Sequence, residues 1–90
     1  MKFTVEYFLK DANHMLGIWE RDVKAIENGT YKYDGSMSKS CIDALCYSKV
    51  KTYKNVIAYL ETLPLDLVIQ TSTGLTEEGS KYYELVNKLA

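Results

Sequence analysis

A lysine-rich segment at residues 47–55 carries the side chains most able to contact another macromolecule. If a helix starts after Ser48, apolar residues occupy its buried face and polar residues point outward. Lysine and asparagine can read base edges in a DNA major groove, threonine can contact a thymine methyl group, and flanking lysines can meet phosphates. The candidate DNA contacts are Ser48, Lys49, Lys51, Thr52, Lys54, Asn55 and Tyr59. The simpler interpretation is that this face is only solvated.

No constellation of residues indicates catalysis or a metal site. His14 is the single histidine, and with Asp11 one helical turn before it supplies at most half of a metal site. Cys41 and Cys46 lack the spacing of a zinc or redox pair, so we expect two buried thiols that act as small apolar side chains. Neither a Gly-x-Ser-x-Gly elbow nor a phosphate-binding glycine loop is present. The sequence therefore predicts no enzyme, no cofactor and no bound metal.

The size and charge of the chain exclude several classes of protein. Its 90 residues are 47% hydrophobic and 26% charged, which predicts one globular domain over residues 1–90. No apolar run is long enough for a membrane span or a secretion signal, so we expect a cytoplasmic protein without a membrane partner. The net charge of −1 argues against binding nucleic acid by bulk attraction. The middle of the chain, residues 30–60, is nevertheless basic and residues 61–90 are acidic, which is compatible with a local DNA-contacting face.

The first element is a long amphipathic helix. Apolar residues from Val5 to Ile26 recur at steps of three and four, which predicts a helix over residues 5–28. Thr4 is placed to cap its first free amides, and Gly29 can adopt the left-handed conformation that closes its end. Gly17 is more typical of close approach by another helix than of a hinge. Residues 30–36 then combine alternating tyrosines with an Asp-Gly turn, which suits a short strand.

Residues 39–62 have two interpretations. Ser38 or Ser40 can cap a first helix, and Ser48 can cap a second one, which would make residues 47–49 the turn of a helix-turn-helix. Alternatively the apolar residues keep one helical phase throughout, and the segment is a single uninterrupted helix. Periodicity alone does not choose between them.

The last third of the chain reads as strand, turn and helix. Pro64 ends whatever helix precedes it, because proline lacks an amide donor and forces its predecessor toward extended geometry. Residues 65–71 contain a β-branched apolar run short enough for a strand, and a turn follows. Thr76 is then placed to cap a final helix over residues 76–89, with Glu77 and Glu78 in its first turn.

Two stretches carry a resemblance to a known family. The segment from Ile42 to Glu61 resembles the helix-turn-helix of MarR-type winged-helix regulators, and Leu75-Thr76-Glu77-Glu78-Gly79 is similar to the Leu-Thr-x-x-Gly that opens the helix after the wing. The resemblance implies a mainly α fold with a small β element, in the form of a winged helix-turn-helix. It implies a small transcriptional or copy-control regulator that binds double-stranded DNA. The long first helix supplies more apolar surface than one short core can cover, so we expect a homodimer. Two recognition helices would then lie about 34 Å apart.

The alternative fold is a three-helix bundle of residues 5–28, 39–62 and 76–89. Such a bundle would be a small protein-interaction or inhibitor module without nucleic-acid binding. The eight tyrosines suit this function equally well, because tyrosine is amphipathic and enriched at interfaces. Whether residues 46–50 form a helix or a turn distinguishes the two folds.

Overall fold

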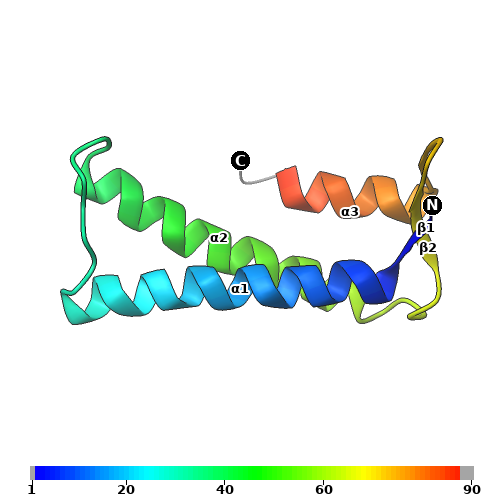
Figure 1. Cartoon of the computed structure of the whole chain (residues 1–90), viewed down its shortest axis with the longest axis horizontal. Coiled ribbons are helices and arrows are strands. Elements are labelled where there is room, and N and C mark those ends of the chain that lie inside the picture. The colour runs from blue at the N-terminus through cyan, green and yellow to red at the C-terminus, as the bar shows by residue number, and fades with distance from the viewer. Residues whose placement is uncertain (1, 88–90) are drawn as a thin grey trace.

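The computed structural model describes residues 2–87, which form three helices and a three-stranded antiparallel sheet. The order is β1 (Lys2–Thr4), α1 (Val5–Asn28), α2 (Lys39–Leu60), β2 (Val68–Thr71), β3 (Gly74–Leu75) and α3 (Glu77–Asn87). Helices α1 and α2 lie side by side as a long antiparallel hairpin, and α3 lies alongside only the half of the hairpin nearest the sheet (Figure 1). The expected mainly α fold with a small β element is therefore confirmed.

Helix α1 has the predicted bounds, but its start is stabilised differently from the prediction. Thr4 occupies the capping position in an extended conformation, yet its side chain makes no capping hydrogen bond. Instead the first free amides of the helix, those of Val5 and Glu6, donate to the carbonyls of Leu67 and Leu65 at 2.9 and 3.0 Å. The chain before β2 thus replaces the side-chain cap. Gly29 closes the helix with φ 74°, as predicted.

Helix α2 runs without interruption from Lys39 to Leu60, so the predicted turn at residues 47–49 is wrong. Ser38 caps it, its hydroxyl accepting from the Cys41 amide at 3.3 Å. No glycine or proline occurs between that cap and Glu61, and the buried residues share one helical face along the whole length. The structure therefore has the single-helix alternative for this segment.

The first strand of the sheet is also not where the sequence suggested. Residues 31–34 form no strand; β1 is the N-terminal segment Lys2–Thr4, which pairs with β2 so that Lys2 lies opposite Thr71. Strand β2 pairs with β3 on its other side, where Gln70 faces Leu75. The order β1-β2-β3 ties the beginning of the chain to its last third.

The core lies at the sheet end of the hairpin, where α1, α2, β2 and α3 meet. Its buried members are Val5, Phe8, Ala12, Val56, Leu60, Ile69 and Tyr82. The ring of Phe8 lies 4.8 Å from that of Tyr82, which joins α1 to α3. Burial of these side chains is the main source of stability for the fold.

The Leu75-Thr76-Glu77-Glu78-Gly79 segment fixes α3 against β2. The Thr76 hydroxyl accepts from the Gly79 amide at 3.1 Å, as predicted for a cap, and also lies 2.9 Å from the Val68 carbonyl oxygen. Gly79 is buried against the backbone of Ile69, where a Cβ atom would lie 2.0 Å from the carbonyl oxygen. Only glycine permits this approach. The predicted end of this helix, residues 88–89, lies outside the described residues.

Gly17 shows the opposite situation. A Cβ at this position would meet nothing within 4 Å, and the residue is exposed in the middle of α1. The expectation that another helix approaches closely here is wrong, because α2 packs on a different face of α1.

Two glycine substitutions should therefore have opposite effects on stability. Gly79→Ala should lower the free energy of unfolding by about 1–3 kcal/mol, because α3 must move away from Ile69. Gly17→Ala, its matched control, should raise it by about 0.5–1 kcal/mol, because alanine is the better helix former in open space. Urea denaturation of the two variants measures both. A neutral Gly79→Ala would contradict the close contact.

Candidate functional site

The exposed polar face of α2 retains part of the predicted DNA-contacting set. Lys51, Lys54 and Asn55 are exposed and lie within two turns of one another. Ser48 and Lys49 are half-buried, which leaves less of their side chains available to a large partner.

Thr52 does not belong to this face, which corrects the prediction. It is 2% exposed, and its hydroxyl donates to the Ser48 carbonyl at 2.9 Å inside the helix. Thr52 precedes Val56 and Leu60 at steps of four, so all three lie along the buried side of the continuous helix. A buried threonine whose hydroxyl is already bonded cannot read a base.

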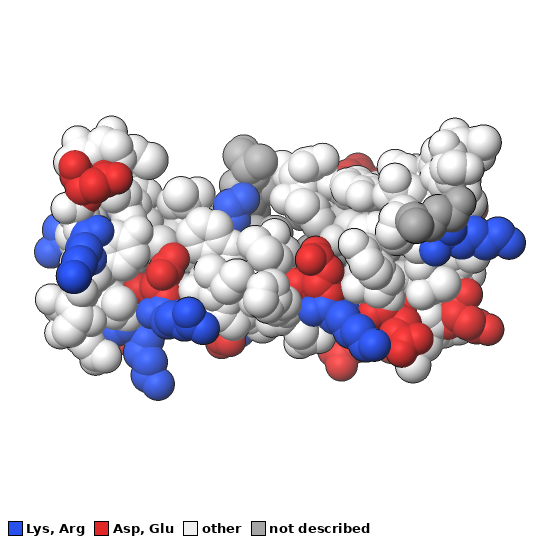
Figure 2. All heavy atoms as spheres, in the orientation of Figure 1, with Lys and Arg blue, Asp and Glu red and all other residues white. Residues whose placement is uncertain are grey.

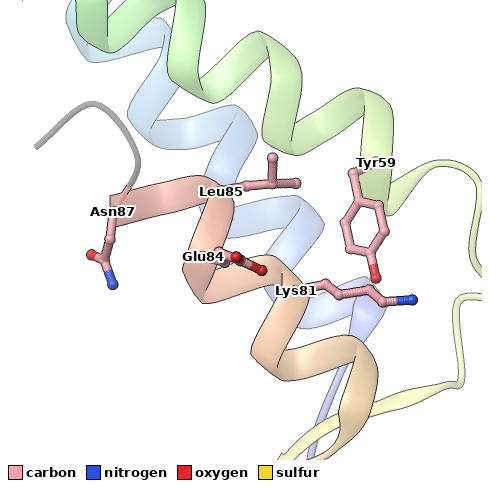
Figure 3. Close-up of a pocket in the computed structure, with 5 residues that line it drawn as sticks. All are labelled: Tyr59, Lys81, Glu84, Leu85 and Asn87. Atoms are coloured by element: carbon pink, nitrogen blue, oxygen red, sulfur yellow. The ribbon is translucent and has the colours of Figure 1, made fainter.

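Tyr59 faces α3 instead of open solvent. Its ring extends from α2 toward α3, and its hydroxyl lies 3.4 Å from the Glu78 carbonyl oxygen (Figure 3). The two helices enclose an open cleft of about 740 Å³ here, lined by Tyr59, Lys81, Glu84, Leu85 and Asn87. Tyr59 is therefore half-buried between helices and is poorly placed to contact DNA.

A second concavity lies between α1 and α2, and no residue of α3 lines it. We call it the α1–α2 groove; it has a volume of about 520 Å³ and is lined by Glu20, Val23, Lys24, Glu27, Tyr47, Val50 and Lys54. Val23 and Val50 are half-buried, whereas Tyr47 is 48% exposed. Water therefore reaches an apolar surface that a binding partner could cover.

The charged side chains of the α1–α2 groove are balanced in number. Two carboxylates, Glu20 and Glu27, accompany two ammonium groups, Lys24 and Lys54. Across residues 2–87 the one side-chain ion pair is between Lys10 and Glu6, at 3.6 Å, so these four charges are not paired with one another. Figure 2 shows the same mixture over the face in view, where basic and acidic side chains are interspersed.

Sequence reasoning missed this groove because it combines residues of two helices. Val23 belongs to the apolar stripe of α1, and Val50 interrupts the lysine-rich segment. An apolar residue inside an otherwise polar helical face was the available signal, but its partner on α1 depends on how the two helices align.

The connection between α1 and α2 is held by a small aromatic cluster. The Tyr33 hydroxyl donates to Asp43 Oδ1 at 2.5 Å, and the Tyr31 and Tyr33 rings are 4.8 Å apart. The Lys39 ammonium lies 5.7 Å from the centre of the Tyr33 ring. The hydrogen bond to Asp43, with partial desolvation, raises the pKa of Tyr33 to about 12. This cluster anchors the loop to the first turns of α2.

The two cysteines have different environments. Cys46 is buried as predicted, and burial together with the nearby carboxylates Asp22 and Asp43 raises the pKa of its thiol. Cys41 is exposed, so the expectation that both thiols are buried is wrong for this residue. It lies on the solvent side of the first turn of α2.

His14 and Asp11, the candidate half of a metal site, are both exposed on α1. Within residues 2–87 there is no group of three or more histidine, cysteine, aspartate or glutamate side chains placed to hold a metal ion. None of the helices in this range combines the length and the apolar character that a membrane crossing requires.

Comparison of the chain with protein-family models, curated proteins and solved structures found no match.

Because of the hydrogen bond of Tyr33, the stability of the protein should fall as the pH rises through the alkaline range. Because the pKa of Tyr33 is raised to about 12 in the folded state, its stabilising effect is fully present below the ordinary tyrosine pKa of about 10. That effect is lost as the pH rises from about 10 to about 12. Tyr33→Phe should thus lower the urea midpoint at pH 8 but change it little at pH 12. An equal difference at both pH values would contradict the Tyr33–Asp43 bond.

Proposed function

We propose that this chain is a small protein-interaction module that binds its partner through the α1–α2 hairpin. The observation that carries this proposal is the length of the hairpin relative to the rest of the fold. Helices of 24 and 22 residues pack on each other, whereas α3 has 11 described residues and accompanies one half of the pair. Within residues 2–87, the other half relies on two helices alone to cover its apolar side chains.

The shape of the molecule supports the proposal. Its extents are 42 × 20 × 20 Å and its radius of gyration is 15.2 Å. A compact 90-residue domain would have a radius of gyration of about 12 Å. An elongated domain of this size exposes more apolar surface than one short core can cover, and partner binding is the usual way to cover it.

Exposed apolar side chains lie on the uncovered half of α2. Leu45 is 38% exposed and Tyr47 is 48% exposed, while Ile42 and Cys46 beside them are buried in the hairpin. Large aromatic and aliphatic side chains on a rigid helix are the groups that typically anchor protein interfaces. The tyrosine hydroxyl also keeps such a surface soluble when no partner is bound.

A photocrosslinking amino acid should locate the binding surface. When benzoylphenylalanine replaces Leu45 or Tyr47 in cells of the source organism, irradiation should link the chain to a protein partner. Leu65 is the control, since it is 55% exposed but lies in the segment just before β2. Crosslinked products of equal yield at all three positions, or no crosslinks at Leu45 and Tyr47, would contradict the proposal.

DNA binding is the second candidate, because one group of observations favours it. Lys51, Lys54 and Asn55 are exposed on α2, and the β2–β3 hairpin leads into α3 through the Thr76 and Gly79 contacts, much as a wing leads into the next helix. A winged-helix regulator of this kind would have to present the middle of a continuous helix to the major groove. The balanced surface charge favours the interaction module over it.

A duplex titration tests the second candidate. If α2 reads DNA, Lys51→Ala and Asn55→Ala should each weaken specific binding by about 1–3 kcal/mol. Lys54→Ala should weaken binding to all sequences and reduce the salt slope by about one unit. Thr52→Val is the control and should leave the affinity unchanged, because this side chain is buried. A flat titration of the wild-type protein against random duplex at low salt removes DNA binding altogether.

A further inference from the structure

We infer that the α1–α2 groove is the contact surface for a second copy of this chain, related to the first by a two-fold axis that crosses the groove obliquely, perpendicular to the line from Glu27 to Lys54. This inference rests on the proposed function and names the partner. The proposed contact surface lies on the side of the hairpin that α3 does not line.

The chemistry of the groove fits a partner with the same surface. Val23 and Val50 supply a half-buried apolar floor, and the exposed ring of Tyr47 stands beside it. A strongly basic or acidic partner would leave one pair of the four groove charges facing its own sign. A partner that carries two carboxylates and two ammonium groups matches the groove charges in number.

The charges toward the two ends of the groove can pair across an antiparallel contact between two copies. Glu27 lies next to the end of α1, at the loop end of the hairpin, whereas Lys54 lies toward the opposite end of α2. A two-fold axis perpendicular to the line from Glu27 to Lys54 exchanges these two positions. Glu27 of each copy then faces Lys54 of the other, which satisfies the requirement that a two-fold interface be self-complementary.

The accessible surface of the molecule has room for such an interface. It measures 6111 Å² for a chain of 10.3 kDa. A monomeric globular protein of this mass is expected to expose about 5,350 Å². The excess of roughly 750 Å² is close to the approximately 800 Å² that each partner buries in an interface of ordinary size.

The first experiment measures dimerisation of the full chain by sedimentation equilibrium at low salt. The wild-type protein should be a dimer at tens of micromolar, in the range typical of weak dimers. Tyr47→Glu should make it monomeric, because it buries a charge in the apolar part of the interface. Met37→Glu is the matched control: Met37 is also 48% exposed but lies in the loop outside the groove, so this variant should remain a dimer. Circular dichroism confirms that both variants are folded.

The second experiment tests the antiparallel pairing by charge exchange. Lys54→Glu alone and Glu27→Lys alone should each weaken the homodimer by about tenfold or more, since each places like charges together at two symmetric positions. An equimolar mixture of the two variants should recover near wild-type affinity as a heterodimer, in which every pair is again opposite in sign. Lys51→Glu, which makes the same charge change outside the groove, should leave dimerisation unaltered.

The outcomes separate this inference from the proposed function. A monomeric wild-type protein, or a dimer insensitive to both Tyr47→Glu and the charge exchange, overturns the inference. If crosslinks at Tyr47 then reach a different protein, the interaction-module function still stands. If the protein is monomeric and Leu45 and Tyr47 give no crosslinks at all, both proposals fall.

Discussion

The contact between the start of α3 and the backbone of Ile69 determines how the rest of the molecule is covered. Thr76 and Gly79 hold the first turn of α3 against β2, and β2 in turn pairs with β1, which leads directly into α1. From this fixed start, 11 residues extend about 16 Å, whereas the 24 residues of α1 extend about 36 Å. The core therefore forms at the sheet end, and in the part of the chain that the structure describes the far half of the hairpin depends on α1 and α2 alone.

The fold could be predicted from the sequence wherever one element carried its own signal. The apolar stripe gave the bounds of α1, and the β-branched run before the Thr-Gly turn located β2. The continuity of α2 could not be decided, because the residues of two helices and of one long helix would share the same phase across Ser48. Strand β1 was missed because three residues show no periodicity, and its pairing with Thr71 is a long-range contact.

The same distinction applies to the functional residues. The exposure of Lys51, Lys54 and Asn55 followed from the helical pattern of α2. Thr52 was misplaced because its polar side chain was assigned to the outer face, whereas the buried side of α2 runs through Thr52, Val56 and Leu60 at steps of four. The groove required a further piece of information, which is the alignment of Val23 on α1 with Val50 on α2. Tertiary packing alone supplies that alignment.

The arrangement of charge explains why the basic middle of the sequence does not become a basic surface. The lysines of residues 30–60 fall in one third of the sequence, but the hairpin brings carboxylates of α1 beside Lys54. Glu20 and Glu27 share the groove with Lys54, so the local potential is close to balanced where the sequence suggested an excess of positive charge. A phosphate backbone gains little from such a surface, since its affinity grows with the number of phosphates that cations neutralise and nearby carboxylates repel it. A protein surface of mixed charge gains more, because each of its charges can meet an opposite one while the valines and Tyr47 lose their contact with water.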